Sequence, residues 1–247
     1  MNKNFKLTIE YDGSNYCGWQ RQPNGPSIQE TIENALQTMT REKVTLIGSG
    51  RTDAGVHAIG QTANFHCDTD IPPQAFQKGL NSLLPDDIVI RECLPVADQF
   101  HARFSVISKR YRYQIRNAPI PAAIGRNYEW WIRTPLNINA MRSAAAIFVG
   151  QHDFKAFEGT GSPRAHTTRT VMEATIESHD KDQRIIFDIE AEGFLRFMVR
   201  NIVGTLVAVG LGKLTAEGVI AIFESKDRTQ APATAPAKGL SLIQVHY

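Results

Sequence analysis

The sequence predicts an α+β fold built from two similar halves. Short runs in which apolar and polar residues alternate indicate strands, and between them lie longer runs with an apolar stripe at helical spacing. In the first half these runs follow one another as β-α-β-β-α-β, and the second half is similar with longer insertions. We therefore divide the chain into an N-terminal half, residues 1–104, and a C-terminal half, residues 105–247.

The first strand and the first helix have the clearest patterns. Residues 5–12, FKLTIEYD, alternate cleanly, as expected of a strand with one buried face. Residues 27–39, SIQETIENALQTM, begin with a capping box between Ser27 and Glu30. The same segment predicts an apolar stripe along one side of a helix, formed by Ile28, Ile32, Ala35, Leu36 and Met39.

Three further strands and one helix complete the first half. A strand at 44–48, VTLIG, leads into a strand at 59–67, IGQTANFHC, and one face of the latter is predicted to hold Ile59, Ala63, Phe65 and Cys67. The helix at 72–85 begins at two prolines and ends at Pro85. A strand follows at 87–94, DIVIRECL.

The second half combines extended segments, a hairpin and three helices. The predicted elements are strands at 109–116 and 127–133, a helix at 138–150, a hairpin made by 169–178 and 184–193, an apolar helix from about Phe194, a shorter helix from Thr215 and a terminal strand at 240–247. An Ala/Pro run at 230–237 is expected to be a loop.

Composition favours an ordinary globular protein. No window approaches the roughly 18 apolar residues that a membrane span needs. The first residues run straight into a strand pattern, which leaves no room for a signal peptide. The three cysteines, Cys17, Cys67 and Cys93, are odd in number and far apart, which suits a reducing compartment. We therefore expect a cytoplasmic protein.

The charge is unevenly distributed along the chain. The net charge is only +2, but residues 101–170 contain eleven Lys and Arg against three Asp and Glu. A basic central segment in an otherwise acidic chain is typical of a protein with a surface that binds a polyanion. A solvated face of mixed charge is the alternative interpretation.

Familiar catalytic motifs are not matched. The glycines around Ser49 stand too close to it for a nucleophile elbow, and the same stretch fails the dinucleotide fingerprint at its last position. His57 lies four residues after Asp53, but the histidines and cysteines show no zinc spacing. We expect no metal site, because two potential ligands are too few.

Asp53 stands in an unusual stretch, GSGRTDAGVHA at 48–58, with no second carboxylate beside it. A structural turn residue that bonds its own backbone is one interpretation of it, and His57 fits the same interpretation. The apolar helix supplies another, because Arg200 is enclosed there by apolar residues and a buried guanidinium needs an anion. That anion is either Asp53 or a structural acid such as Asp188 or Glu190.

If Asp53 is the partner of Arg200, the arginine lowers the pKa of the carboxyl group and burial raises it, so that Asp53 stays ionised in a partly dry pocket. An ionised carboxylate suits a nucleophile rather than a general acid. Ordinary glycoside hydrolysis needs a second carboxylate to protonate the leaving group. A single carboxylate suffices when the leaving group is stable as an anion and need not depart, as with uracil on ribose.

The strand at 108–116, SKRYRYQIR, interleaves basic and aromatic residues. Alternation places Tyr111 and Tyr113 on one face with Ile115 and the arginines on the other. Tyrosines on the apolar face of a strand are commonly core residues, which is one interpretation. The other is that Tyr111 stacks on a splayed-out base while basic residues hold the phosphates, namely Lys109, Arg110, Arg112 and Arg116.

These segments resemble the bacterial tRNA pseudouridine synthase A family. The matching motifs run in order along nearly the whole chain: YDGSNYCGWQRQ, GRTDAGVHA, FHARFSVISKRYRY, HDFKAF, FLRFMVRNIVG and DRTQAPATAPAKGL. The resemblance implies conversion of uridine to pseudouridine at positions 38, 39 and 40 of the tRNA anticodon stem-loop, with no cofactor. It also implies a homodimer, and two ferredoxin-like halves that form one extended antiparallel sheet with helices on one face and a central cleft.

The resemblance also assigns roles to single residues. Asp53 matches the catalytic aspartate and Tyr111 the stacking tyrosine of the family. Arg51 matches the arginine that helps to take the base out of the helix, and Arg200 the arginine paired with the aspartate. Leu240 falls where the family packs an aliphatic side chain against the base.

Two other functions remain open on the residues alone. A non-catalytic tRNA-binding protein would use Asp53 only as a turn residue, and an unrelated hydrolase would use Asp53 together with His57. The stretch at 159–168, GTGSPRAHTT, matches no strong family pattern, so its RNA contacts are not predicted.

Overall fold

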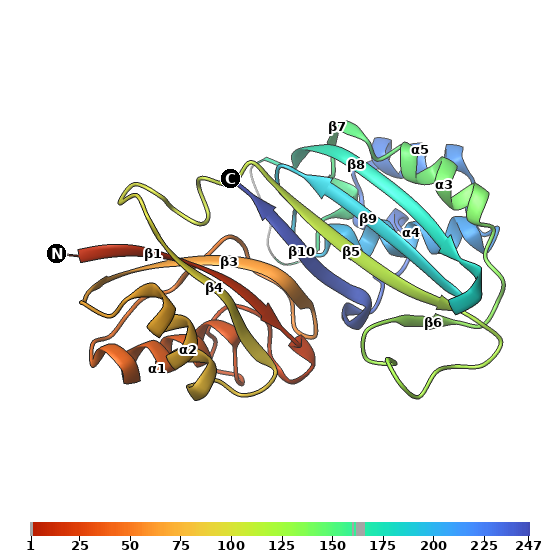
Figure 1. The fold of residues 1–247 in the computed structure, drawn as a ribbon. Coiled ribbons are helices and arrows are strands. Elements are labelled where there is room, and N and C mark those ends of the chain that lie inside the picture. Colours follow the sequence, from red (N-terminus) through yellow and green to blue (C-terminus); the bar gives the residue numbers. More distant parts are fainter. Residues whose placement is uncertain (1, 160, 162–165) are drawn as a thin grey trace. The chain divides into compact units, whose positions relative to one another are not determined.

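The computed structural model describes residues 2–159, 161 and 166–247, and the chain divides into two compact units (Figure 1). Unit 1 consists of Met1–Ile107 and Ser241–Tyr247, and unit 2 of Ser108–Leu240. The terminal strand therefore belongs mostly to unit 1, whereas the sequence-based division counted it with the C-terminal half.

Unit 1 contains the predicted β-α-β-β-α-β order. Its strands β1 (Asn2–Tyr11), β3 (His57–Asp68) and β4 (Ile88–Val96) are antiparallel, with β1 in the middle. The short strand β2 (Ile47–Gly48) and the terminal strand β10 (Leu240–His246) both pair with β3, and β10 runs parallel to it. The helices α1 (Ile28–Thr40) and α2 (Pro73–Leu83) lie on one side of these strands (Figure 1).

The core of unit 1 follows the predicted alternation, with one exception. Phe5 packs on the rings of Phe65 and Phe76, at centroid distances of 5.3 and 5.1 Å. The predicted burial of Ile59 is wrong, because this side chain is 53% exposed. The β1–β3 register shifts there, since Ile9 pairs with Gln61 but Tyr11 pairs with Ala58. Such a bulge re-aims the side chains of the strand that carries it.

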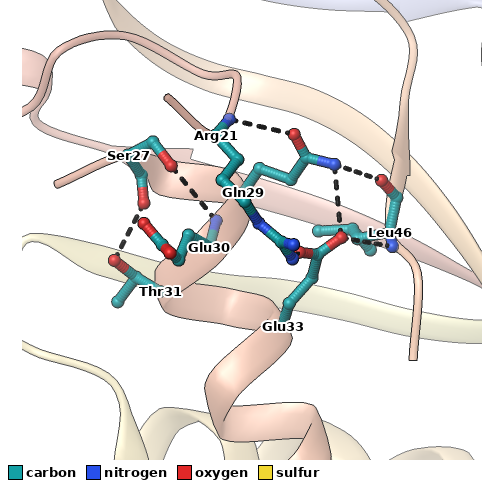
Figure 2. Close-up of polar contacts among 7 residues, drawn as sticks. All are labelled: Arg21, Ser27, Gln29, Glu30, Thr31, Glu33 and Leu46. Carbon is teal, nitrogen blue, oxygen red and sulfur yellow. Dashed lines mark hydrogen bonds and ion pairs between the residues drawn. The ribbon is translucent and has the colours of Figure 1, made fainter. Parts of the chain in front are cut away.

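A buried carboxylate in α1 holds the segment that leads to residues 48–58 (Figure 2). Glu33, only 4% exposed, is ion-paired with Arg21 and accepts hydrogen bonds from Gln29 Nε2 at 3.2 Å and from Leu46 N at 2.9 Å. The predicted cap is also present, since Ser27 Oγ accepts from Glu30 N at 3.4 Å. Only Ile47 and Gly48 of the predicted strand at 44–48 are paired, because Leu46 N is bonded to the Glu33 carboxylate instead.

Unit 2 is built on four antiparallel strands. Their order is β5 (Ser108–Asn117), β9 (Arg184–Ala191), β8 (Thr168–His179) and β7 (Gly150–Asp153), and β6 (Trp130–Ile132) runs parallel to β5. The predicted hairpin is confirmed as β8 and β9, whereas β7 was not predicted. The helices α3 (Ile138–Ala146), α4 (Met198–Gly210) and α5 (Ala216–Ser225) lie on one side of these strands (Figure 1).

The α+β class is therefore confirmed. Most of the strand pairs are antiparallel, as expected, but β10 and β6 each run parallel to a neighbour. The apolar helix begins at Met198 rather than near Phe194, because Phe197 has the left-handed φ of 62° and ends the preceding turn. The ferredoxin-like description of the halves and the central cleft stay predictions.

No helix within the described residues is long and apolar enough to cross a membrane. Of the stretch at 159–168, residues 160 and 162–165 lie outside the described residues.

Candidate active site

Asp53 begins a tight turn in unit 1. Val56 N donates to the Asp53 carbonyl at 3.1 Å, and Gly55 has a φ of +76°, a left-handed conformation that glycine adopts without strain. The Asp53 side chain is half-buried. The turn is closed by backbone groups, which accounts for the position of Asp53 in the chain.

The residue before Asp53 is held by the last residue of β1 and by the segment that follows this strand. Thr52, 8% exposed, bonds through Oγ1 to the Tyr11 hydroxyl at 2.7 Å, and its carbonyl accepts from Trp19 N at 3.1 Å. Gly18 has a φ of +101°, and a Cβ there would lie 2.6 Å from the Thr52 carbonyl oxygen. Burial raises the pKa of Tyr11 far above its usual value, so its hydroxyl remains neutral. These contacts fix the backbone position from which Asp53 projects.

Sequence reasoning missed Tyr11, Gly18 and Trp19 as supports of the site. Their signal was present in YDGSNYCGWQRQ, where two glycines accompany bulky aromatic residues, but only the three-dimensional structure brings this segment against residues 48–56. Trp19 also covers Gly48, because a Cβ on that glycine would lie 2.6 Å from the indole ring.

Arg51 and His57 flank the turn differently. The Arg51 side chain is exposed, whereas His57 is only 4% exposed. His57 Nδ1 lies 3.0 Å from both Gly13 N and Asp12 Oδ1. A protonated Nδ1 would donate to Asp12, but the Gly13 amide can only donate, so we assign Nδ1 as an unprotonated acceptor. This arrangement favours the structural interpretation of His57.

Tyr111 and Tyr113 lie on the apolar face of β5 in unit 2, as alternation predicted. Tyr113 is fully buried and its hydroxyl donates to the Pro236 carbonyl at 2.8 Å. Burial raises the pKa of Tyr113 far above its usual value, and the nearby Arg200 charge partly opposes that shift. Tyr111, 8% exposed, meets Phe194 edge-on at a centroid distance of 5.1 Å. Tyr113 is thus a core residue, and Phe194 orients Tyr111.

Arg200 occupies the first turn of α4. Its Nε donates to the Ala235 carbonyl at 2.8 Å, and its guanidinium carbon lies 4.9 Å from the centre of the Phe197 ring. The next residue, Asn201, is fully buried and bonds to Phe157 O at 2.7 Å and to Thr234 Oγ1 at 2.6 Å. The start of α4 is therefore tied to the segment at 228–236, and this network determines where the Arg200 guanidinium points.

Asp188 and Glu190, the two structural acids considered as partners of Arg200, are each paired with another arginine. Asp188 accepts a bidentate pair from Arg112 at 2.9 and 2.8 Å, and Glu190 accepts from Arg110 Nε at 3.1 Å. Both pairs lie directly across β5 and β9. Cross-strand pairing of opposite charges stabilises the sheet, which accounts for these acids without Arg200.

The remaining basic residues of β5 also interact within unit 2. Arg110 pairs with Glu173 in addition to Glu190, and Arg116 Nε lies 3.9 Å from the buried Glu129. Lys109, half-buried, falls on the same alternation as the tyrosines. The local positive charge is therefore partly neutralised, and phosphate contacts by Lys109, Arg110, Arg112 and Arg116 stay a prediction.

The predicted site residues fall into two groups. Arg51 and Asp53 stand together at the turn of unit 1, whereas Tyr111, Arg200 and Leu240 belong to unit 2. Leu240 is 5% exposed at the start of β10. Within the described parts of both units, no three His, Cys, Asp or Glu side chains are grouped so as to hold a metal ion.

The sequence matches one protein family along most of its length. The family model for tRNA pseudouridine synthase matches residues 7–105 and 144–247. Proteins named tRNA pseudouridine synthase A are 48% identical in Acetivibrio thermocellus and 49% identical in Thermoanaerobacter sp., each over 245 residues covering 99% of this chain and 100% of the relative. The relative of that name in Ruminiclostridium cellulolyticum is 46% identical over 247 residues, covering 99% of this chain and 100% of its own.

Among solved structures, the crystal structure of the archaeal box H/ACA sRNP Nop10-Cbf5 complex aligns with 82% of this chain and 44% of its own, at 12% identity and a TM-score of 0.38. The sequence relatives alone establish the family relationship. By that relationship the chain belongs to the tRNA pseudouridine synthase family.

Proposed function

We propose that this protein is an isomerase that converts uridine to pseudouridine at positions 38, 39 and 40 in the anticodon stem-loop of tRNA. The observation that carries the proposal is the match of 99% of the chain, at 44 to 49% identity, to proteins named tRNA pseudouridine synthase A. The glycine-shaped turn that holds Asp53 supports it, because a nucleophile needs a fixed position close to its target.

Asp53 is the proposed catalytic residue. The target uridine leaves the RNA stack, and the ionised carboxylate assists cleavage of the bond between N1 of uracil and C1′ of ribose. The uracil stays bound, reorients and forms a new bond from C5 to C1′, after which the C5 proton is lost and N1 gains one. Attack on C1′, attack on C6 and a glycal route all satisfy this balance. The site must exclude water, which would otherwise release the uracil.

Four residues are proposed to hold the substrate or orient Asp53. Tyr111 stacks on the base and Leu240 packs an aliphatic side chain against it, which fits the burial of both side chains. Arg200 pairs with the Asp53 carboxylate, and the occupation of Asp188 and Glu190 by other arginines supports this choice. Arg51, exposed beside the turn, assists extrusion of the base.

The remaining features follow the family. We propose a cytoplasmic homodimer that needs no cofactor and no metal, and that binds the tRNA backbone through basic residues of β5. Each arginine of this strand would then exchange a carboxylate partner for a phosphate oxygen, which is an acceptor of the same charge sign and similar geometry.

The decisive experiment measures release of tritium to water from unmodified tRNA that carries tritium at uridine C5, with no cofactor added. We expect release by the wild-type protein and none by Asp53→Ala. Sequencing of the product should place pseudouridine at positions 38, 39 and 40. Modification only at other positions would contradict the proposed target.

The alternative of a non-catalytic tRNA-binding protein gives a different result. It would bind tRNA with unchanged affinity in the wild type and in Asp53→Asn, and neither protein would release tritium. A hydrolase that uses Asp53 and His57 would release uracil and lose turnover in His57→Ala, where we expect only a small effect.

A further inference from the structure

An exposed aromatic ring with a cationic neighbour stands in unit 1, apart from the Asp53 turn in sequence. Phe104 is 75% exposed. The imidazole of His101 lies against it at a centroid distance of 4.3 Å and an interplanar angle of 32°, and the Arg103 guanidinium carbon is 5.4 Å from its centre. The ring thus combines a solvent-facing aromatic surface with a neighbouring positive charge.

The backbone beneath this ring is firmly held. The turn closes through two amides, Phe104 N at 3.1 Å and Ser105 N at 2.9 Å, which both donate to the His101 carbonyl. Ala102 is fully buried, with its amide bonded to Asn64 Oδ1 at 2.9 Å and its carbonyl to the Tyr247 hydroxyl at 2.8 Å. The ring is therefore displayed by a fixed turn.

The imidazole is oriented by the same turn. His101 Nδ1 accepts from the backbone amides of Arg103 at 3.2 Å and of Phe104 at 3.3 Å. The imidazole of His101 is thus held against one face of the Phe104 ring, which remains 75% exposed. We name His101, Arg103 and Phe104 the aromatic platform.

The chemistry of the platform favours a nucleobase over an apolar protein surface. Residues 99–107, which include the platform, contain one Arg and no Asp or Glu. Any of the four bases can stack on an aromatic ring. The phosphate group of the same nucleotide is negatively charged and can pair with a neighbouring arginine. A protein partner that buried Phe104 against an apolar surface would also have to supply an acidic side chain for Arg103.

We propose that the aromatic platform stacks on an unpaired base of the tRNA substrate, at a position other than the uridine that reacts. The inference rests on the proposed function for the identity of the RNA. It adds a second stacking contact to that of Tyr111, on a different unit of the chain.

The test compares Phe104→Leu with Phe104→Trp in binding to an unmodified tRNA transcript. The leucine keeps an apolar side chain but removes the π-face, and we expect the Kd to rise about tenfold. The tryptophan should keep the affinity, and its added fluorescence should be quenched by tRNA. Ile107→Ala is the matched control, because Ile107 is 60% exposed in the same segment.

A fully paired RNA duplex of equal length is the control ligand, and its Kd should not change in Phe104→Leu. An unchanged Kd for tRNA, or an equal loss on the duplex, would overturn the inference. So would dissociation of a dimer in Phe104→Leu, detected by sedimentation, with unchanged tRNA affinity of the subunit. Tritium release by the wild type tests the proposed function separately, and a tRNA affinity that depends on Phe104 would support stacking even if no tritium were released.

Discussion

Arg200 and Ala235 are joined by two hydrogen bonds in opposite directions. The Nε of Arg200 donates to the Ala235 carbonyl at 2.8 Å, and the Ala235 amide donates to the Arg200 carbonyl at 3.1 Å. The first turn of α4 and the segment before β10 are locked together at this point. The Arg200 side chain thus has two roles. It ties α4 to this segment, and its guanidinium, which is proposed to orient Asp53, is itself oriented by the Ala235 carbonyl.

Arg200→Lys should therefore lower kcat much more than stability. Lysine keeps the charge but lacks Nε and the planar fork, so we expect kcat to fall about 10²-fold or more while the free energy of unfolding falls by about 1 kcal/mol. Single-turnover tritium release and urea unfolding measure the two effects. Arg142→Lys is the matched control, because Arg142 Nε also donates to a carbonyl, that of Ile176 at 3.1 Å. Equal losses of kcat in both variants would contradict the role of Arg200.

Gly18→Ala should disturb the Asp53 turn. The new Cβ would lie 2.6 Å from the Thr52 carbonyl oxygen, at a φ of +101°, so we expect at least about 1–3 kcal/mol of destabilisation and a lower kcat with little change in tRNA affinity. Thermal unfolding and tritium release check this.

Gly125→Ala is the control for Gly18→Ala, because it shows the effect of a left-handed backbone without a steric contact. Gly125 has a φ of +80° and no atom within 4 Å of an added Cβ, so its substitution should cost about 1 kcal/mol without affecting kcat. A loss of kcat as large as that in Gly18→Ala would show that the Thr52 contact is not responsible.

Arg112→Gln tests whether β5 contacts phosphates. If Arg112 exchanges Asp188 for a phosphate, the slope of log Kd against log salt concentration should become shallower by about one. We expect that change, measured by filter binding of tRNA between low and physiological salt. An unchanged slope together with reduced stability would assign Arg112 only to its ion pair with Asp188.

Cys93 should make the protein less stable at alkaline pH. Burial raises the pKa of this thiol to about 12, and Glu92 adds to the shift. Above about pH 8.5 the unfolded chain loses the thiol proton while the folded chain keeps it, so the free energy of unfolding falls as pH rises towards 12. Below pH 8.5 both states hold the proton and this effect is absent.

Cys93→Ala removes this dependence. We expect the variant to be less stable at pH 7, because a buried sulfur is lost, but to lose less stability than the wild type between pH 8.5 and 10.5. Urea unfolding at several pH values measures both. A fall in stability in Cys93→Ala that parallels the fall in the wild type would refute the assignment to Cys93.

Elements with a strong local signal were predictable from the sequence. Strand β1 follows from the alternation of Phe5, Leu7 and Ile9, and α1 from the cap at Ser27, because both depend on neighbours in the chain. Ile59 and the start of α4 were not predictable. A register shift between strands turned the first outward, and the left-handed Phe197 delayed the second.

Asp53, Tyr111 and Arg200 could be singled out from residue types and motifs, since a lone aspartate among glycines and an arginine in an apolar helix are both unusual in the sequence. Which groups support them required the tertiary structure. Thr52 is held by Tyr11 and Trp19, more than thirty residues earlier in the chain, and Arg200 by a carbonyl thirty-five residues later. Likewise, alternation placed the arginines of β5 on one face, but only strand pairing gave Arg112 its partner Asp188.

The sequence by itself determined the local periodicities and the chemically unusual residues, because these are properties of neighbouring positions. The tertiary structure decided burial, register and ionic partners, because each depends on atoms that the chain brings together from distant positions.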